Sequence, residues 1–320
     1  MKAIVFEKYG SPDALALKEV EKPTPNEDKV LVKIEAASVN PLDWHRMRGA
    51  PFIVRFTDGF FKPKNSALGA DIAGRVEAIG KHVTQFQPGD AVFGEIGAGG
   101  LAEYVCVTES HLALKPASLS FAQLAAVPVA GLTALQALRD HGKIEAGQHV
   151  LINGASGGVG TYAVQIAKVL GAEVTAVCST RNVEMVKSLG ADHVIDYSKE
   201  RQTQTNRQFD LIVDNVGNFS AGDYKRLLKP GGTAVVVGFT TLRRMFSVII
   251  LGRFFSGGKK IAPMLAQPKQ EDLLFLKELL ETEKIISIID KCYPFAETAE
   301  AIRYLETGHA RGKVIITVAQ

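Results

Sequence analysis

The sequence has little of what marks secreted, disulfide-bonded or membrane-spanning proteins. Its 320 residues include three widely separated cysteines and no CxxC pair, which argues against both a disulfide framework and a zinc ribbon. The longest strongly apolar run, residues 246–251, falls far short of the roughly 20 residues needed to span a bilayer. Residues 1–10 lack the charged, then apolar, then small-residue order of a signal peptide. We therefore expect a cytoplasmic protein.

An excess of charge of one sign is also missing. Lys and Arg number 37 and Asp and Glu number 34, which leaves a net charge of +3. No basic block with interleaved aromatic residues accompanies this small excess, so we expect no nucleic-acid partner. The basic residues between Arg243 and Lys260 could contact a membrane surface. A solvated loop edge is the simpler interpretation, and we do not expect contact with a membrane.

What the chain does contain is an ordinary globular composition. Apolar residues make up 46% and charged residues 22%, which excludes a disordered chain. The length suggests about two domains, at roughly 100–200 residues each.

The first third has the pattern of β structure. Short apolar or alternating segments at 31–39, 72–80, 91–96 and 101–107 are separated by Pro, Gly and Asn turn signals. Strands at this spacing suggest a barrel-like or sandwich domain. Ser120 and Gln123 then form a capping box that predicts a helix, and a second helical stretch, 132–140, ends at Gly142.

From residue 149 onward, strands and helices alternate. Apolar segments at 149–155, 173–179, 193–197, 209–216 and 233–239 predict strands, and 259–266 could supply a sixth. Between the first two lies a helix that ends at Gly171, and a second helix runs from Asn182, as its cap, to Gly190. Repeated βα units predict a parallel, doubly wound sheet of the nucleotide-binding type. An amphipathic helix beyond Pro268 and a closing strand at 313–318 complete the chain.

The most specific local feature is the run Gly154 to Gly160, between the first of these strands and its helix. Compared with GxGxxG, Ala155 takes the place of the first glycine, and Gly157 and Gly160 follow. A pyrophosphate can approach such a bare turn and meet the positive end of the helix dipole. We therefore predict cofactor contacts from Ser156, Gly157, Gly158 and Val159.

The end of the second strand of this series indicates which dinucleotide is bound. An NAD site places Asp or Glu there to hold the ribose 2′-OH. Here the strand runs into Ser179, Thr180 and Arg181, and a guanidinium can grip a 2′-phosphate instead. With Tyr197 as a further donor, these residues predict NADPH as the cofactor. The alternative is that Arg181 is a solvated residue near a helix cap.

Several motifs occur together over nearly the whole chain: Asn40-Pro-Leu-Asp43, Gly69-Ala-Asp71-Ile-Ala-Gly74, Phe86-Gln-Pro-Gly89-Asp90, Pro128…Gly131-Leu-Thr133-Ala134, Leu189-Gly-Ala-Asp192, Lys229-Pro-Gly231-Gly232 and Gly312-Lys313. With the glycine turn, they resemble the medium-chain dehydrogenase/reductase superfamily, in its zinc-independent quinone oxidoreductase and enone (alkenal/one) reductase branch. The resemblance implies a GroES-like β-barrel catalytic domain from residues 1–122 and 269–320. A doubly wound Rossmann domain, residues 123–268, is inserted between them, and NADPH lies in the cleft. It also implies a homodimer.

The same resemblance implies site residues. Asn40 lies beside the nicotinamide and substrate, and Asp43 supports its loop, unless both only cap a turn after the strand ending at Val39. His45 stands where many quinone oxidoreductases have tyrosine, and it could donate a proton or have no role. Further cofactor contacts are implied at Thr133, Val216, Gly217, Gly238 and Phe239.

Zinc-dependent members of the superfamily hold their metal with Cys, a His-Glu pair and a further Cys. The matching positions here are Ser38 and Asn40, then Gly69-Ala70-Asp71, so no metal site is expected. No tyrosine has a lysine four residues later, so short-chain dehydrogenase chemistry is also unsupported. Quinones and α,β-unsaturated carbonyls are already electron-poor, and hydride can add to them once both partners are aligned. We therefore predict reduction of a quinone or enone by NADPH.

Two alternatives remain open. An enoyl-thioester reductase would need a tyrosine donor after Asp43, and residues 44–66 contain none. A cofactor-binding protein without turnover, like the crystallin members of the family, would bind NADPH only. The phenylalanines at 52, 56, 60 and 61, and at 246, 254 and 255, could line a substrate pocket, or pack in the core or a dimer contact.

Overall fold

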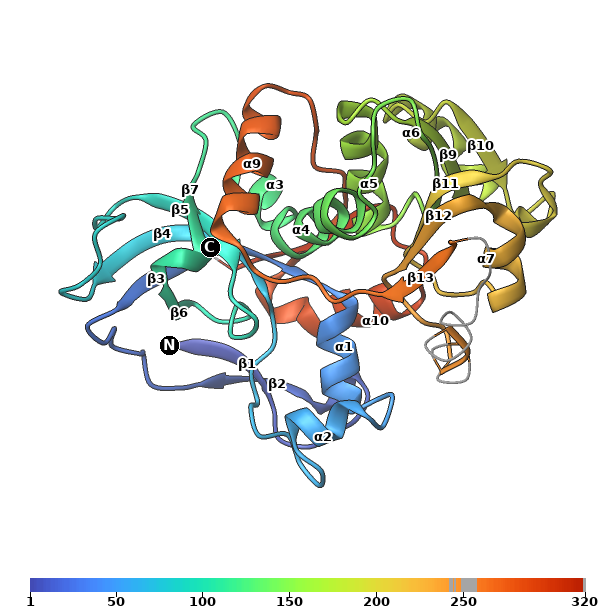
Figure 1. The fold of residues 1–320 in the computed structure, drawn as a ribbon. Coiled ribbons are helices and arrows are strands. Elements are labelled where there is room, and N and C mark those ends of the chain that lie inside the picture. Colours follow the sequence, from blue (N-terminus) through green and yellow to red (C-terminus); the bar gives the residue numbers. More distant parts are fainter. Residues whose placement is uncertain (242–243, 245, 249–257, 319–320) are drawn as a thin grey trace. The chain divides into compact units, whose positions relative to one another are not determined.

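The computed structural model describes residues 1–241, 244, 246–248 and 258–318 (Figure 1). The chain divides into two compact units. The first comprises residues 1–129, 268–282 and 287–320, and the second comprises residues 130–267 and 283–286. Residues 123–129, expected in the nucleotide-binding domain, group with the first unit because the helix at 121–125 packs against that unit's strands. Arg243, Arg253, Phe254 and Phe255, which entered the sequence analysis, lie outside the described residues.

The first unit is built on antiparallel strands. A two-stranded sheet pairs β1 (Lys2–Phe6) with β2 (Leu15–Glu19). The larger sheet has the order β14 (Ile289–Pro294), β15 (Lys313–Thr317), β3 (Lys29–Val39), β4 (Asp71–Ile79), β5 (Ala91–Glu95) and β7 (Leu112–Leu114). Strand β6 (Tyr104–Thr108) also pairs with β3, and only β14 and β15 run parallel. Strand β15 from the C-terminal end thus lies beside β3 from the first third of the chain.

Five α-helices accompany these strands among the described residues: α1 (Pro41–Arg48), α2 (Val54–Asp58), α3 (Phe121–Ala125), α9 (Gln270–Glu281) and α10 (Thr298–Glu306). The predicted capping box of α3 is confirmed, since the N–H of Gln123 donates to Ser120 Oγ and the Ser120 N–H donates to Gln123 Oε1. Helix α1 was not predicted. It begins directly after Asn40, with Pro41 in its first turn, and the Asp43 carboxylate accepts the N–H of Asn40 at 2.8 Å.

The second unit is a six-stranded, fully parallel sheet with the order β10 (His193–Asp196), β9 (Glu173–Cys178), β8 (His149–Asn153), β11 (Phe209–Asp214), β12 (Leu228–Val236) and β13 (Lys260–Pro263). The predicted sixth strand is therefore present, though shorter than expected. Val150, Leu151 and Ile152 are fully buried, which explains the continuous apolar run at this position. Figure 1 shows these strands side by side.

Helices α5 (Gly158–Val169), α6 (Val183–Ser188) and α7 (Ala221–Leu227) connect the strands. The chain winds outward from β8 through α5 and α6, and from β11 through α7 in the other direction. Right-handed crossovers in opposite directions place α5 and α6 on one face of the sheet and α7 on the other. The helical stretch predicted at 132–140 begins earlier, as α4 (Pro128–Gln136), and continues as a π-helical turn, Ala137–His141, before Gly142.

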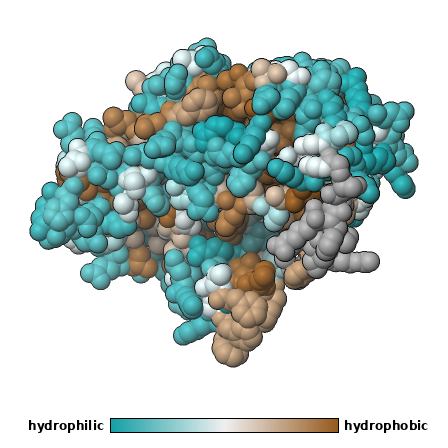
Figure 2. All heavy atoms as spheres, viewed as in Figure 1, coloured by the Kyte–Doolittle hydropathy of each residue, from teal (hydrophilic) through white to brown (hydrophobic). Residues whose placement is uncertain are grey.

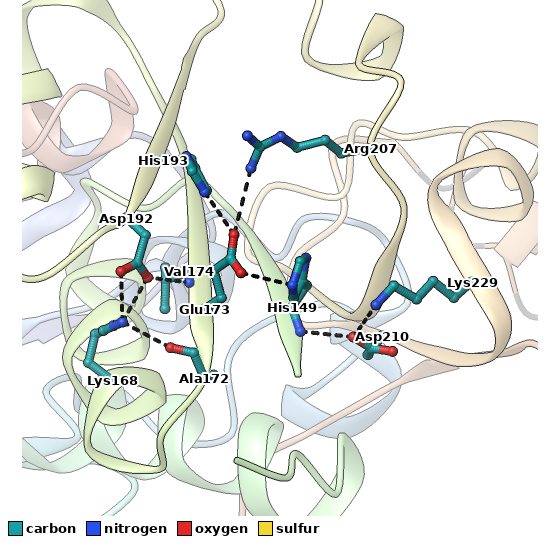
Figure 3. Close-up of polar contacts among 10 residues, drawn as sticks. All are labelled: His149, Lys168, Ala172, Glu173, Val174, Asp192, His193, Arg207, Asp210 and Lys229. Carbon is teal, nitrogen blue, oxygen red and sulfur yellow. Dashed lines mark hydrogen bonds and ion pairs between the residues drawn. The ribbon is translucent and has the colours of Figure 1, made fainter. Parts of the chain in front are cut away.

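Charged side chains line the edge of the parallel sheet where the strands begin (Figure 3). Glu173 at the start of β9 pairs with His149 on β8 and His193 on β10, each at 2.8 Å. Asp210 on β11 accepts from the His149 N–H and from Lys229, also at 2.8 Å. These pairs join neighbouring strands at the edge opposite to the glycine turn, so they stabilise the sheet.

The described part of the chain contains no helix long and apolar enough to cross a membrane.

Candidate active site

The glycine turn of the second unit is held by a close backbone contact. Gly154 follows β8 with a φ of +74°, and a Cβ on Gly160 would lie only 2.1 Å from the Gly154 carbonyl oxygen. Gly160 therefore has to be glycine for α5 to begin this close to the strand. Gly157 has extended backbone and is the N-cap of α5, and the first atom that a Cβ there would meet lies at 3.5 Å. Ser156, Gly158 and Val159 are half-buried beside it.

This turn lies at the switch point of the sheet. The chain leaves β8 toward β9 on one side, and β11 adjoins β8 on the other. In open parallel sheets, ligands bind outside the carboxyl ends of the strands at such a point. Buried Asp214 at the end of β11 organises it by accepting from Asn153 Nδ2 at 2.7 Å and from the Tyr224 hydroxyl at 2.6 Å. Burial beside this carboxylate raises the pKa of Tyr224, so its proton stays on the phenol.

The two segments predicted to contact the cofactor after β11 and β12, residues 216–217 and 238–239, lie against each other. Gly217 has a φ of +68°, and a Cβ on it would lie 1.9 Å from the Gly238 carbonyl oxygen. Val216 and Phe239, their neighbours, are partly exposed. The amide of Asn215 donates to the Asn153 carbonyl, but its Oδ1 is buried and has no partner within the described residues. Thr133 is buried on α4 of the same unit.

The end of β9 departs from the prediction in one respect. Asn182 precedes α6 but makes no side-chain cap. Its Nδ2 instead donates to Ser156 Oγ at 2.9 Å and to Ser179 Oγ at 3.2 Å. This amide joins the glycine turn to the end of the next strand, and its Oδ1 is buried without a partner in the described part of the chain. The sequence could not distinguish a cap from a link across strands, because both use Asn at the same place.

Among the predicted 2′-phosphate residues, Thr180 contacts the carboxylate of Asp196, a residue that was not predicted to belong to this site. Arg181 and Thr180 are exposed in a short 3₁₀ turn, Thr180–Asn182, and Tyr197 is exposed just after β10. The Thr180 hydroxyl donates to Asp196 Oδ2 at 2.6 Å, and this hydrogen bond lowers the pKa of Asp196. The hydroxyl proton of Thr180 is thus already committed, and Lys199 lies 3.6 Å from the same carboxylate.

In the first unit, Asn40 belongs to a buried network that joins three strands. Asp71 Oδ2 on β4 accepts from Ser38 Oγ on β3 at 2.6 Å, from Asn40 Nδ2 at 2.9 Å and from the Lys313 ammonium on β15 at 3.2 Å. Lys313 also donates to Asn40 Oδ1 at 2.5 Å. Ser38, Asn40, Asp71 and Lys313 are all at most 3% exposed.

Chemistry alone determines how the Asn40 amide is oriented in this network. An ammonium can only donate and a carboxylate can only accept, so Oδ1 must face Lys313 and Nδ2 must face Asp71. One amide N–H of Asn40 is left after these two bonds. Asn40 can therefore present one donor of fixed direction to a ligand.

Two further carboxyl groups lie in the same region. Asp43 accepts the N–H groups of Asn40 and Gly69, yet burial raises its pKa to about 6. Glu95 lies directly opposite Asp71 in the β4–β5 pair, and burial, with a contribution from Asp71, raises its pKa to about 7. Its Oε2 is buried without a hydrogen-bond partner among the described residues. Glu95 therefore holds its proton over part of the neutral range.

His45 does not fit the predicted role of proton donor. Its Nδ1 lies 2.7 Å from the Ala50 carbonyl, which can only accept, so Nδ1 carries the proton of the neutral ring. Burial lowers the pKa of His45, so the ring is uncharged at neutral pH. The one ring proton is thus bound inside the loop.

Lys313 and Glu95 were not predicted from the sequence as site residues. Lys313 was quoted only as part of the Gly312-Lys313 motif, and Glu95 only as part of a strand. A lysine flanked by the buried run Val314–Ile316 is the one signal that could have marked Lys313, because an unpaired ammonium is rarely buried.

Comparisons with known proteins agree with both units. Residues 26–117 match the family model for the alcohol dehydrogenase GroES-like domain, and residues 189–316 match that for a zinc-binding dehydrogenase. The chloroplast envelope quinone oxidoreductase homolog of Arabidopsis thaliana is 35% identical, over 99% of this chain and 98% of that protein. The NADPH-dependent alkenal/one oxidoreductase of the same plant is 34% identical, over 99% of this chain and 79% of that protein. The solved structure of the quinone oxidoreductase from Coxiella burnetii superposes with a TM-score of 0.88 at 32% identity, covering 100% and 99% of the two chains.

The fold and the sequence together define a two-unit oxidoreductase with a GroES-like unit and a nucleotide-binding unit. The chain belongs to the medium-chain dehydrogenase/reductase superfamily, in its quinone oxidoreductase and enone reductase branch. A nicotinamide cofactor follows from this membership. The residues of the second unit fit it, because the bare turn at Gly157 opens α5 at the switch point. Two buried amide oxygens there, of Asn182 and Asn215, have no hydrogen-bond partner among the residues that the structure describes.

Zinc, which the name of one family model implies, does not fit the residues present. Among the described residues no three His, Cys, Asp or Glu side chains gather as a metal site requires. The acceptors of Asn40 and Asp71 that would face such an ion are instead bound by the Lys313 ammonium.

Proposed function

We propose that this enzyme reduces a quinone or an α,β-unsaturated carbonyl compound with NADPH, by direct hydride transfer and without a metal ion. The single observation that carries the proposal is the buried Lys313 ammonium on Asn40 and Asp71. It supplies a fixed positive charge where a metal-dependent dehydrogenase would need open ligands. The relatives named for quinone and alkenal/one reduction support the substrate class.

In this proposal the second unit holds the cofactor. The N–H groups at Ser156–Val159 would hold the pyrophosphate at the positive end of α5, and the segments at Val216–Gly217 and Gly238–Phe239 would line the cofactor site at the switch point. Thr133 is the last of the residues that we propose to contact the cofactor. Bound NADPH supplies the hydride from the nicotinamide C4 to an acceptor that is already electron-poor.

The first unit orients and stabilises the substrate. The family resemblance assigns Asn40 to the nicotinamide and substrate, and its remaining N–H can donate to the oxygen that gains charge. Lys313 and Asp71 fix the direction of this donor, while Asp43 holds the backbone of Asn40. Alignment of both reactants can contribute up to ~7–11 kcal/mol to lowering the barrier.

NADPH rather than NADH is proposed because of Arg181. Arg181 and Ser179 follow β9, and Tyr197 follows β10, the strand that pairs with β9. A guanidinium at this end of the sheet suits a 2′-phosphate, whereas Asp196, whose carboxylate binds Thr180, opposes it. Arg181→Ala should raise KM for NADPH by ~10-fold or more and leave KM for NADH nearly unchanged, since one charge-assisted contact contributes about 1.5–3 kcal/mol. Lys187→Ala, at an exposed lysine of α6, is the control and should alter neither value. Equal losses with both cofactors would contradict the assignment.

NADPH oxidation measured with 1,2-quinones, 1,4-quinones, alkenals and enoyl thioesters, with a chelator present, tests the reaction. Turnover of a quinone or alkenal that the chelator leaves unchanged is the expected result. Loss of activity with chelator would overturn the metal-free mechanism. Turnover confined to enoyl thioesters would favour that reductase class, and NADPH binding without any turnover would favour a crystallin-like role.

We also propose a homodimer in the cytoplasm. Sedimentation velocity of the purified protein tests the first point, and cell fractionation tests the second. A monomer, or a protein recovered from an organelle, would contradict them; both Arabidopsis relatives named above carry chloroplast names.

A further inference from the structure

An exposed aromatic surface lies on the first unit, around the short helix α2. It consists of Phe52, Ile53, Phe56, Phe60 and Phe61, and we call it the aromatic surface. Phe61 is 90% exposed and Phe56 is 67% exposed, and the other three are about half exposed. At about 200 Å² for a whole aromatic side chain, these residues offer water an apolar patch of roughly 500 Å². The largest patch of a soluble monomer is about 300–600 Å² and is often functional.

The surface is an ordered one. The ring of Phe60 lies edge-on to Phe52 at 5.4 Å and to Phe61 at 5.0 Å, and Phe56 contacts both Phe52 and Phe60. The backbone beneath is fixed because the Tyr9 hydroxyl donates to the Gly59 carbonyl at 2.5 Å. In Figure 2 these side chains form the light-brown projection over α2. The patch is therefore convex and pre-formed, which does not suit a bound peptide strand or helix.

The net charge around the aromatic surface is positive. Lys62 and Lys64 are exposed at its edge, and neither forms an ion pair in the described part of the chain. The only acid of residues 51–66, Asp58, is neutralised by Arg46 at 2.9 Å. Arg55 lies over the Tyr9 ring and adds a further positive charge. A second copy docked symmetrically on this patch would place lysines against lysines.

We propose that the aromatic surface docks on an anionic lipid bilayer, with its rings in the interface and Lys62 and Lys64 on the headgroups. Aromatic side chains favour the membrane–water interface, and basic residues beside them attract anionic lipids. This reverses the expectation of no membrane contact and concerns a different segment from residues 243–260, which are largely outside the described part. The proposal does not depend on the proposed reaction, because its readout is binding.

Flotation of the full-length protein with vesicles tests this. Vesicles of phosphatidylcholine with about a third phosphatidylglycerol should carry the protein at low salt, and pure phosphatidylcholine vesicles should carry at least ~10-fold less. Raising the salt to about 0.5 M should weaken the binding, because the lysine contribution is screened. No binding to the anionic vesicles, or equal binding to both kinds, would overturn the proposal.

Two double variants separate the contributions of the rings and the charges. Phe56→Ser with Phe61→Ser, and Lys62→Glu with Lys64→Glu, should each reduce vesicle binding at least ~10-fold while leaving circular dichroism and melting unchanged, since all four side chains are exposed. Leu265→Ser, at an 80% exposed leucine of the second unit, is the apolar control. Lys8→Glu with Lys284→Glu matches the charge change at exposed positions elsewhere. Binding that falls equally in the controls would overturn the proposal.

A depth probe distinguishes insertion from simple adsorption. The wild-type spectrum, which comes from Trp44, is first subtracted from that of Phe61→Trp. The remaining emission of the introduced tryptophan should shift to the blue when anionic vesicles are added, and bromine-labelled acyl chains should quench it. An unshifted spectrum would contradict insertion. If sedimentation shows instead that Phe56→Ser with Phe61→Ser turns a dimer into a monomer, the surface is a contact between copies and the proposal fails.

Discussion

At the residue scale, Lys313 explains how a buried carboxylate and an oriented amide coexist. An ammonium and a carboxylate out of water are each costly, and the cost is offset only where geometry and hydrogen bonds are complete. Asp71 has hydrogen bonds to both oxygens, from Ser38, Asn40 and Lys313 on one and from the Val129 N–H on the other. Each charge in the network thus has its hydrogen bonds, and removal of one side chain leaves another buried group without its partner.

Removing the ammonium tests that vulnerability. Lys313→Met should lower the free energy of unfolding by about 3–5 kcal/mol, because Asp71 is left buried without its counter-charge. Urea unfolding gives the value, and Lys33→Met, at an exposed lysine of β3, is the control. Adding Asp71→Asn to Lys313→Met should recover part of the loss. If the loss in the double variant equals the sum of the losses in Lys313→Met and Asp71→Asn measured singly, the two side chains are not coupled.

Glu95 makes the stability of the fold depend on pH. Between the usual glutamate pKa of 4.5 and the folded value of about 7, the native protein holds a proton that the unfolded chain has lost. Stability therefore falls as pH rises through this window, by about 3 kcal/mol at most. Asp71 on β4 raises the value further and Lys313 on β15 lowers it.

Glu95→Gln removes the ionisable group and keeps its shape. The variant should be more stable than the wild type at pH 8 by about 1–3 kcal/mol, with little difference near pH 5. Urea unfolding at several pH values checks this, and Glu21→Gln, at an exposed glutamate, should follow the wild-type curve. An unchanged pH slope in Glu95→Gln would contradict the raised pKa.

At the element scale, we expect two glycines of the glycine turn to have different roles: Gly160 is needed for folding and Gly157 for binding of the cofactor. A Cβ at Gly160 meets the Gly154 carbonyl at 2.1 Å, whereas at Gly157 the nearest atom is at 3.5 Å. Gly160→Ala should therefore destabilise the second unit by several kcal/mol, ~3 or more. Gly157→Ala should fold normally but bind NADPH at least ~10-fold more weakly, because the methyl group would take the space that we propose for the pyrophosphate. Thermal melting and NADPH titration measure the two effects, and normal NADPH affinity in Gly157→Ala would place the cofactor elsewhere.

At the scale of the whole molecule, the first unit is discontinuous in sequence. Its large sheet needs β15, whose Val314, Ile315 and Ile316 are fully buried, between β14 and β3. A chain that ends at Ile286 lacks this strand and Lys313, so it should be insoluble or unfolded. Thr317→Asp, at the exposed end of the same strand, should remain soluble. Soluble, cooperatively folded protein from the truncated chain would show that β15 is dispensable.

The sequence by itself determined the parallel sheet, its sixth strand, the capping box of α3 and the position of the glycine turn. These features depend on periodicity and on neighbours within a few residues, so local rules suffice to predict them. Helix α1 was missed because Asn40-Pro-Leu-Asp43 suits a capped turn as well as a helix start.

Only the tertiary structure decided which polar groups meet. Lys313 reaches Asn40 across 273 positions of sequence, Glu95 stands opposite Asp71 through strand register, and Asn182 joins two strand ends instead of capping a helix. Four phenylalanines that could have packed in the core are exposed on the first unit. Such contacts depend on how strands distant in the chain pair and pack, and no local pattern of residues encodes that pairing.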